Sequence, residues 1–228
     1  MTTVIDIIGG LIVGGLLMLI AMNALDNQVT SFFNYHSDAI TQQNLTNLSN
    51  TIQYDMRKMG FGVPEYEKTT ILQVASADRI KFLSHLNKVP GMSISGVGSY
   101  DDVADTIEYR FLLSETINVA DTTLTLYDVQ RTVTLPPNAP ETMVIGQVGN
   151  NRVFRYLDQI GNEVGVSIAT KMIEVSLSAF DPRIILTPDL VATGLSAADS
   201  TDLNRQLRML LRTSYWRQTR LISRNLNR

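Results

Sequence analysis

The fold of this chain is decided near its start, by the stretch IIGGLIVGGLLMLIAMNAL, which covers residues 7–25 and contains no charged side chain. As a helix rising 1.5 Å per residue, this stretch spans about 28 Å, close to the thickness of the hydrocarbon core of a bilayer. A cleaved signal peptide would begin with basic residues and end at a small-residue cleavage site, and neither flanks the run. A buried core helix is the other alternative. We expect one transmembrane helix, with a cytoplasmic start and an exported remainder.

Helical periodicity continues beyond this stretch. No Pro or Gly interrupts residues 16–59, and the sequence Gly60-Phe61-Gly62-Val63-Pro64 then predicts the end of the helix. The expected helix has about fifty residues and a length of about 75 Å. Its first half is apolar all round, and its second half is amphipathic, so a following domain must cover the apolar stripe. The residues of that stripe are Ile40, Leu45, Leu48, Ile52, Met56 and Met59.

After Pro64 the hydrophobic period changes from helical to alternating, which predicts half-buried antiparallel strands. The clearest alternation lies in residues 107–113, 173–179 and 207–215, with further strands near 70–75, 79–84, 122–135 and 152–157. Asp158-Gln159-Ile160-Gly161-Asn162 predicts a hairpin turn, and residues 86–105 and 181–204 have the composition of loops.

The predicted fold class is α+β, a long N-terminal helix packed on an antiparallel β-sheet head. The expected parts are residues 1–25 as the transmembrane or filament-core helix, 26–62 as its amphipathic continuation, and 63–228 as a β-rich globular head.

Charge is distributed unevenly along the chain. Residues 1–202 contain all 22 acidic residues and 12 of the 19 basic ones, so they carry −10, whereas the remaining residues carry +7. Such a split predicts a contact between parts of the chain or between neighbouring subunits. Nucleic acid is not an expected partner, because the basic residues alternate with strand-forming apolar ones. The arginines proposed for the contact are Arg205, Arg208, Arg212, Arg217 and Arg220.

Motifs for catalysis and cofactors are missing from the sequence. The chain has no cysteine, and its two histidines, His36 and His85, lie far apart. Neither a zinc-protease motif nor a phosphate-binding loop is present. The loop carboxylates Asp101, Asp102 and Asp105 lack the spacing of a calcium loop. We expect no enzyme activity, no cofactor and no metal.

The apolar stretch contains two features that favour contact with other helices. Gly10 and Gly14 form a Gly-x-x-x-Gly pair, which lets helices approach closely in lipid. Asp6 stands at the edge of the run, where a carboxylate is costly unless it lies in the headgroups or pairs with a cation such as an α-amino group.

Two motifs and their order resemble the type IV pilin superfamily, in particular minor pilins and the larger minor pseudopilins of type II secretion. The segment from Thr2 to Ile8 looks like a mature pilin N-terminus, where the fifth residue is acidic, and Asp6 is fifth when counted from Thr2. Asp55, Arg57 and Gly60 are similar to the Asp-x-Arg-x-x-Gly end of the long helix in larger minor subunits.

The resemblance implies a structural subunit. Asp6 would pair with the N-terminal amine of a neighbouring subunit, the helices would bundle as the filament core, and an inner-membrane machine would extract subunits from the bilayer. Before assembly the subunit would be a single-pass inner-membrane protein with an exported head. After assembly it would belong to an extracellular or periplasmic filament.

Family members carry a basic leader that a dedicated peptidase removes. For this chain the resemblance leaves open prior processing, trimming to Thr2, or a route without that peptidase.

Other functions remain open at this level. A membrane-anchored extracytoplasmic binding or sensor domain would use residues 86–105 or 181–204 and would tolerate loss of Asp6. An envelope structural protein is a further alternative.

Overall fold

The computed structural model describes residues 2–63, 71–86, 105–119, 122–136, 138–165, 169–180 and 215–222. The chain forms two compact units, Met1–Ile40 and Thr41–Arg228. The first consists of the N-terminal part of helix α1 (Thr2–Arg57), and the second, called the head here, contains the rest of α1 and all described strands.

Helix α1 has the length and the end that the sequence predicts. It contains 56 residues and closes at Arg57. The turns that follow use Gly60 and Gly62, whose φ angles of 69° and 71° lie in the left-handed region that favours glycine. Among the described residues, α1 is the one helix long and apolar enough to cross a membrane.

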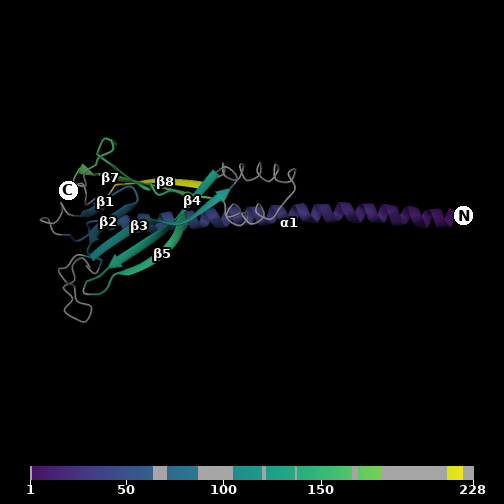
Figure 1. Cartoon of the computed structure of the whole chain (residues 1–228), viewed down its shortest axis with the longest axis horizontal. Coiled ribbons are helices and arrows are strands. Elements are labelled where there is room, and N and C mark those ends of the chain that lie inside the picture. The colour runs from purple at the N-terminus through teal and green to yellow at the C-terminus, as the bar shows by residue number, and fades with distance from the viewer. Residues whose placement is uncertain are drawn as a thin grey trace. The chain divides into compact units, whose positions relative to one another are not determined.

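The head contains two antiparallel sheets. Sheet A has the order β1-β2-β3-β4-β5, so each strand pairs with its neighbour in sequence, and sheet B has the order β6-β7-β8 (Figure 1). The strands of sheet A are β1 (Leu72–Ala75), β2 (Arg79–Ser84), β3 (Asp105–Val119), β4 (Thr122–Thr134) and β5 (Glu141–Val148). The strands of sheet B are β6 (Phe154–Leu157), β7 (Met172–Ala179) and β8 (Tyr215–Ile222).

The α+β prediction is therefore confirmed, and the alternating segments other than 207–215 became strands in the expected places. Strand β5 was missed, because residues 141–148 do not alternate clearly. Of the strand predicted at residues 207–215, only Tyr215 lies within the described residues, and it begins β8. The predicted loops at 86–105 and 181–204 fall almost entirely outside the described residues, although Asp105 belongs to β3.

The predicted turn after β6 is present. The Asp158 carboxylate accepts hydrogen bonds from the backbone N–H groups of Ile160, Gly161 and Asn162, at 2.7 to 2.8 Å. Gly161 has a φ of 99°, which suits glycine.

One hydrophobic core joins the end of α1 to both sheets. Ile52 and Met56 of α1 are fully buried in the same cluster as Phe82 of sheet A and Ile173 of sheet B. Ile40, predicted as the first residue of the buried stripe, is instead 44% exposed. It belongs to the other compact unit, so the buried stripe begins at Leu45.

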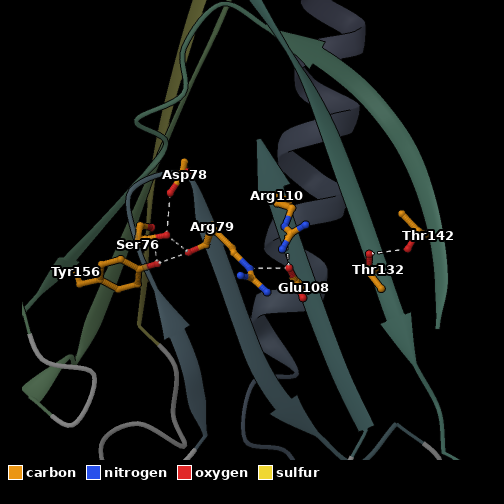
Figure 2. Close-up of polar contacts among 8 residues, drawn as sticks. All are labelled: Ser76, Asp78, Arg79, Glu108, Arg110, Thr132, Thr142 and Tyr156. Carbon is orange, nitrogen blue, oxygen red and sulfur yellow. Dashed lines mark hydrogen bonds and ion pairs between the residues drawn. The ribbon is translucent and has the colours of Figure 1, made fainter. Parts of the chain in front are cut away.

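The face of sheet A turned away from α1 is polar, as Figure 2 shows. Glu108 accepts a hydrogen bond from Arg79 at 2.7 Å and lies 3.2 Å from the Arg110 guanidinium. Thr132 and Thr142 pair across β4 and β5 at 2.8 Å. Along each strand, apolar side chains therefore point toward the core and these polar side chains point toward solvent, which is typical of an antiparallel sheet with one solvated face.

The two sheets are linked at the turn between β1 and β2. The Tyr156 hydroxyl of β6 donates to the backbone carbonyl of Ser76 at 3.0 Å (Figure 2). The backbone N–H groups of Val153 and Phe154 donate to the carbonyl of Ala77. Burial raises the pKa of the Tyr156 phenol, so it remains a hydrogen-bond donor at neutral and moderately alkaline pH.

Candidate functional site: an exposed apolar helix and the end of α1

The apolar stretch of α1 exposes its side chains on every side. None of the residues in the most apolar part of this helix is buried. The large side chains around its whole circumference, among them Leu11, Val13 and Leu17, are more than half exposed. Exposed apolar surface of this extent marks contact with lipid or with other protein.

Small residues divide this apolar surface. At Gly9, Gly10, Gly14 and Gly15, a Cβ would have no atom within 4 Å apart from those of its chain neighbours and the adjacent backbone of its own helix. A second helix could approach the backbone closely there. Thr2 and Asp6 belong to α1, but their side chains lie outside the described residues, so the predicted role of Asp6 stays a prediction.

The helix-end motif brings Asp55 into contact with sheet A. The Asp55 side chain is buried, and its carboxylate accepts hydrogen bonds from the Tyr109 hydroxyl of β3 and from the Arg131 guanidinium of β4, each at 2.6 Å. Lys58 adds a longer ion pair at 3.8 Å. Asp55 is therefore a structural link between helix and sheet.

The electrostatics of this link follow from burial. Burial raises the pKa of the Tyr109 phenol far above its ordinary value of 10, and the negative charge of Asp55 adds to the effect. Tyr109 therefore stays protonated and donates to Asp55. The hydrogen bond to Asp55 likewise raises the pKa of Arg131, so its charge is permanent.

The other two motif residues have different surroundings. Arg57 is exposed at the last position of α1. Gly60 is buried, and its backbone N–H donates to the carbonyl of Leu83 on β2 at 2.8 Å. The motif thus joins the helix to sheet A at Asp55 and Gly60, whereas Arg57 faces solvent.

The basic tail is described in part. Arg205, Arg208 and Arg212 lie outside the described residues. Arg217 donates to the Thr46 hydroxyl of α1 at 3.0 Å, and Arg220, on the opposite face of β8, donates to Glu174 of β7 at 2.6 Å. Because side chains alternate between the two faces of a strand, Arg217 points toward the helix and Arg220 points toward Glu174.

Sheet B contains a charged cluster in which sequence analysis named the tail arginine Arg220 but not its acidic partner, Glu174, or Arg155. The Glu174 side chain is 0% exposed because Arg155 and Arg220, on the strands to either side, cover it. Burial by itself raises the pKa of Glu174, but the hydrogen bonds from Arg220 and Gln218 and the nearby positive charges outweigh it, so the pKa is lowered. Alternation placed Glu174 on the polar face of its strand, but only strand order could show that two arginines enclose it.

The lowered pKa of Glu174 predicts a loss of stability in acid. A carboxylate whose pKa is lower in the folded chain stabilises the fold above its unfolded pKa, near 4.5, and that stabilisation is lost as pH falls through the folded pKa. We expect Glu174→Gln to make the unfolding midpoint of the detergent-solubilised chain less dependent on pH below 4.5, measured by near-ultraviolet circular dichroism.

The control for this prediction is Glu163→Gln, which alters an exposed partner of Arg155 at 3.4 Å. That substitution should leave the acid dependence unchanged, because exposed ion pairs contribute little. If the unfolding midpoints of the wild type and of Glu174→Gln depend equally on pH below 4.5, the acid-sensitive stability does not come from Glu174.

The described part of the chain contains no candidate metal site, because no three His, Cys, Asp or Glu side chains lie close enough together there to hold an ion. Comparison with protein-family models, with curated proteins and with solved structures found no match to this chain.

Proposed function

We propose that this chain is a structural, pilin-like subunit that assembles through its N-terminal helix into a filament of the type IV pilus or type II secretion kind. The observation that carries the proposal is the apolar surface of residues 7–25, which is exposed all round the helix. A soluble protein would bury such a surface, so lipid must cover it before assembly and neighbouring helices after assembly.

Close packing of copies is supported by the glycines. Gly10 and Gly14 lie one turn apart and leave open space beside the backbone. Without a hydrophobic driving force in lipid, helices associate through such close backbone contacts. Bundled copies of residues 7–25 would form the filament core.

Asp6 supplies register in this proposal. A carboxylate among bundled apolar helices is costly unless it is paired. The N-terminal amine of a neighbouring subunit would neutralise it, and this pairing would determine how far each subunit is displaced along the filament axis.

The head is proposed to form the outer surface of the filament. It has its own core and its own compact unit, Thr41–Arg228. Its role here is structural, and an inner-membrane assembly machine would be its partner during export from the bilayer.

The proposal predicts that Asp6→Ala removes the chain from filaments. Removing one partner of a buried ion pair costs about 3–5 kcal/mol, which corresponds to roughly 100-fold or greater loss of incorporation. Filaments sheared from cells expressing each variant would be separated from membranes, and the chain quantified in both fractions. Asp26→Ala is the matched control, because Asp26 is an exposed acid of the same helix.

The two outcomes separate the proposed function from its main alternative. The proposal is supported if the wild type and Asp26→Ala are found in the sheared fraction while Asp6→Ala stays in the membranes. If all three chains stay in the membranes, the protein is an anchored domain that does not polymerise.

A further inference from the structure

Aromatic residues of the helix are confined to one short segment. The first 53 residues contain three aromatic residues of the Phe, Tyr and Trp type, namely Phe32, Phe33 and Tyr35. They are 68%, 65% and 78% exposed, and so they contribute to no core. The apolar stretch that precedes them holds only aliphatic residues, Met, Gly and one Asn.

The rings are arranged as a cluster on the helix surface. Phe32 and Phe33 meet edge to face with centroids 6.3 Å apart, and His36 stacks on Phe32 at 6.0 Å with an interplanar angle of 5°. The cluster belongs to the unit Met1–Ile40, so it is not needed to fold the head.

Spacing relates this cluster to the membrane boundary. Phe32 follows Leu25, the last residue of the apolar stretch, by seven positions, or about 10 Å of helix. The headgroup layer outside the hydrocarbon core is about 5–7 Å thick on each side. Phe32 and Phe33 begin about 10–12 Å beyond Leu25, and their rings reach back to the outer edge of that layer because helical side chains tilt toward the N-terminus. Tyr35 begins about 15 Å beyond Leu25, too far for its ring to reach the layer.

Chemistry favours this location. Tyr and Trp are enriched where membrane meets water, and Phe occurs on the apolar side of helices that lie at the headgroup boundary. Asp26 and Asp38 flank the cluster, and no Lys or Arg occurs before Arg57. A segment with acids and no bases is repelled by anionic headgroups and suits zwitterionic ones.

We propose that Phe32 and Phe33 form an interfacial anchor at the outer edge of the zwitterionic headgroup layer, at the end of the transmembrane segment. The anchor sets the depth of the helix before assembly, because moving the rings outward exposes their apolar surface to water, whereas moving them inward draws Asp26 into hydrocarbon. This inference rests on the membrane anchoring in the proposed function and does not depend on polymerisation.

The test places a single tryptophan at different depths in the full chain, reconstituted in vesicles of phosphatidylcholine and phosphatidylethanolamine. The anchor reporter is Phe33→Trp combined with Trp216→Phe, which removes the exposed native tryptophan of the head. Leu17→Trp in the same background is the deep reference, and the wild-type chain reports on the head. Fluorescence quenching is measured with nitroxide at the headgroup, nitroxide at the end of the acyl chain, and aqueous iodide.

We expect the tryptophan at position 33 to be quenched several-fold more by the headgroup nitroxide than by the acyl-chain nitroxide, and the tryptophan at position 17 to show the reverse. Adding phosphatidylglycerol should not strengthen the headgroup quenching at position 33. The inference is overturned if position 33 responds only to iodide, if it responds best to the acyl-chain label, or if anionic lipid strengthens its quenching.

The failure of each proposal would look different. Loss of acyl-chain quenching at position 17 would mean that the helix does not span the bilayer, and the anchor would fail with it. Failure of the filament proposal would instead appear as wild-type chain that stays in the membranes, or as Asp6→Ala that enters the sheared fraction as the wild type does, with normal quenching at positions 17 and 33.

Discussion

Replacement of Asp55 by alanine is expected to lower the free energy of unfolding of the head by about 3–5 kcal/mol, the usual cost of removing one partner from a buried ion pair. Asp55 is almost fully buried, and the substitution would leave the Arg131 guanidinium and the Tyr109 hydroxyl without the acceptor they share at 2.6 Å. The measurement is denaturant unfolding of the detergent-solubilised chain, followed by near-ultraviolet circular dichroism.

Two further variants make this prediction specific. Glu163→Ala breaks an ion pair whose two side chains are more than half exposed, and it should cost at most about 1 kcal/mol. Adding Arg131→Met to Asp55→Ala should recover part of the loss, since the double variant no longer holds an uncompensated charge. The interpretation of Asp55 as a buried link fails if Asp55→Ala and Glu163→Ala have equal effects.

Ile52→Ala is expected to have an effect of similar size, about 2–5 kcal/mol, for a different reason. Ile52 is 0% exposed in the cluster that joins α1 to both sheets, and its truncation leaves a cavity that the surrounding strands can close only in part. For a domain of this size, each kcal/mol lowers the melting temperature by about 2–4 °C. Thermal unfolding of the full chain would show the shift.

A neighbouring position supplies the matched control for Ile52. Asn50 lies on the exposed side of the same helix, so Asn50→Ala should change stability by about 0.5 kcal/mol or less. A comparable loss in both variants would contradict burial as the cause of the Ile52 effect, because alanine is the better helix former at both positions and helix propensity alone would stabilise both variants.

The sequence could predict those parts of the fold that depend on local pattern. The helix from Thr2 to Arg57, its end near Gly60 and the turn at Asp158 each follow from periodicity or from a residue with special backbone preferences. These signals act within a few positions, so no long-range information is required to read them.

The missed strand β5 shows where local pattern stops. Its residues are largely exposed and lie at one edge of sheet A, so there is little selection for an apolar face. At Gly146 a Cβ would lie 3.6 Å from Leu48 of α1, a contact that exists only once the helix is packed on the sheet. Pairing with β4, more than local propensity, makes this segment a strand.

The candidate site divides in the same way. The sequence by itself determined an apolar helix long enough to span a bilayer and the position of Asp6 at its start, because composition along one helix is readable without a partner. Only the tertiary structure decided that Asp55 meets Tyr109 and Arg131, and that two arginines enclose Glu174. These contacts join residues far apart in the chain, and strand order and register, which one sequence does not state, bring their side chains together.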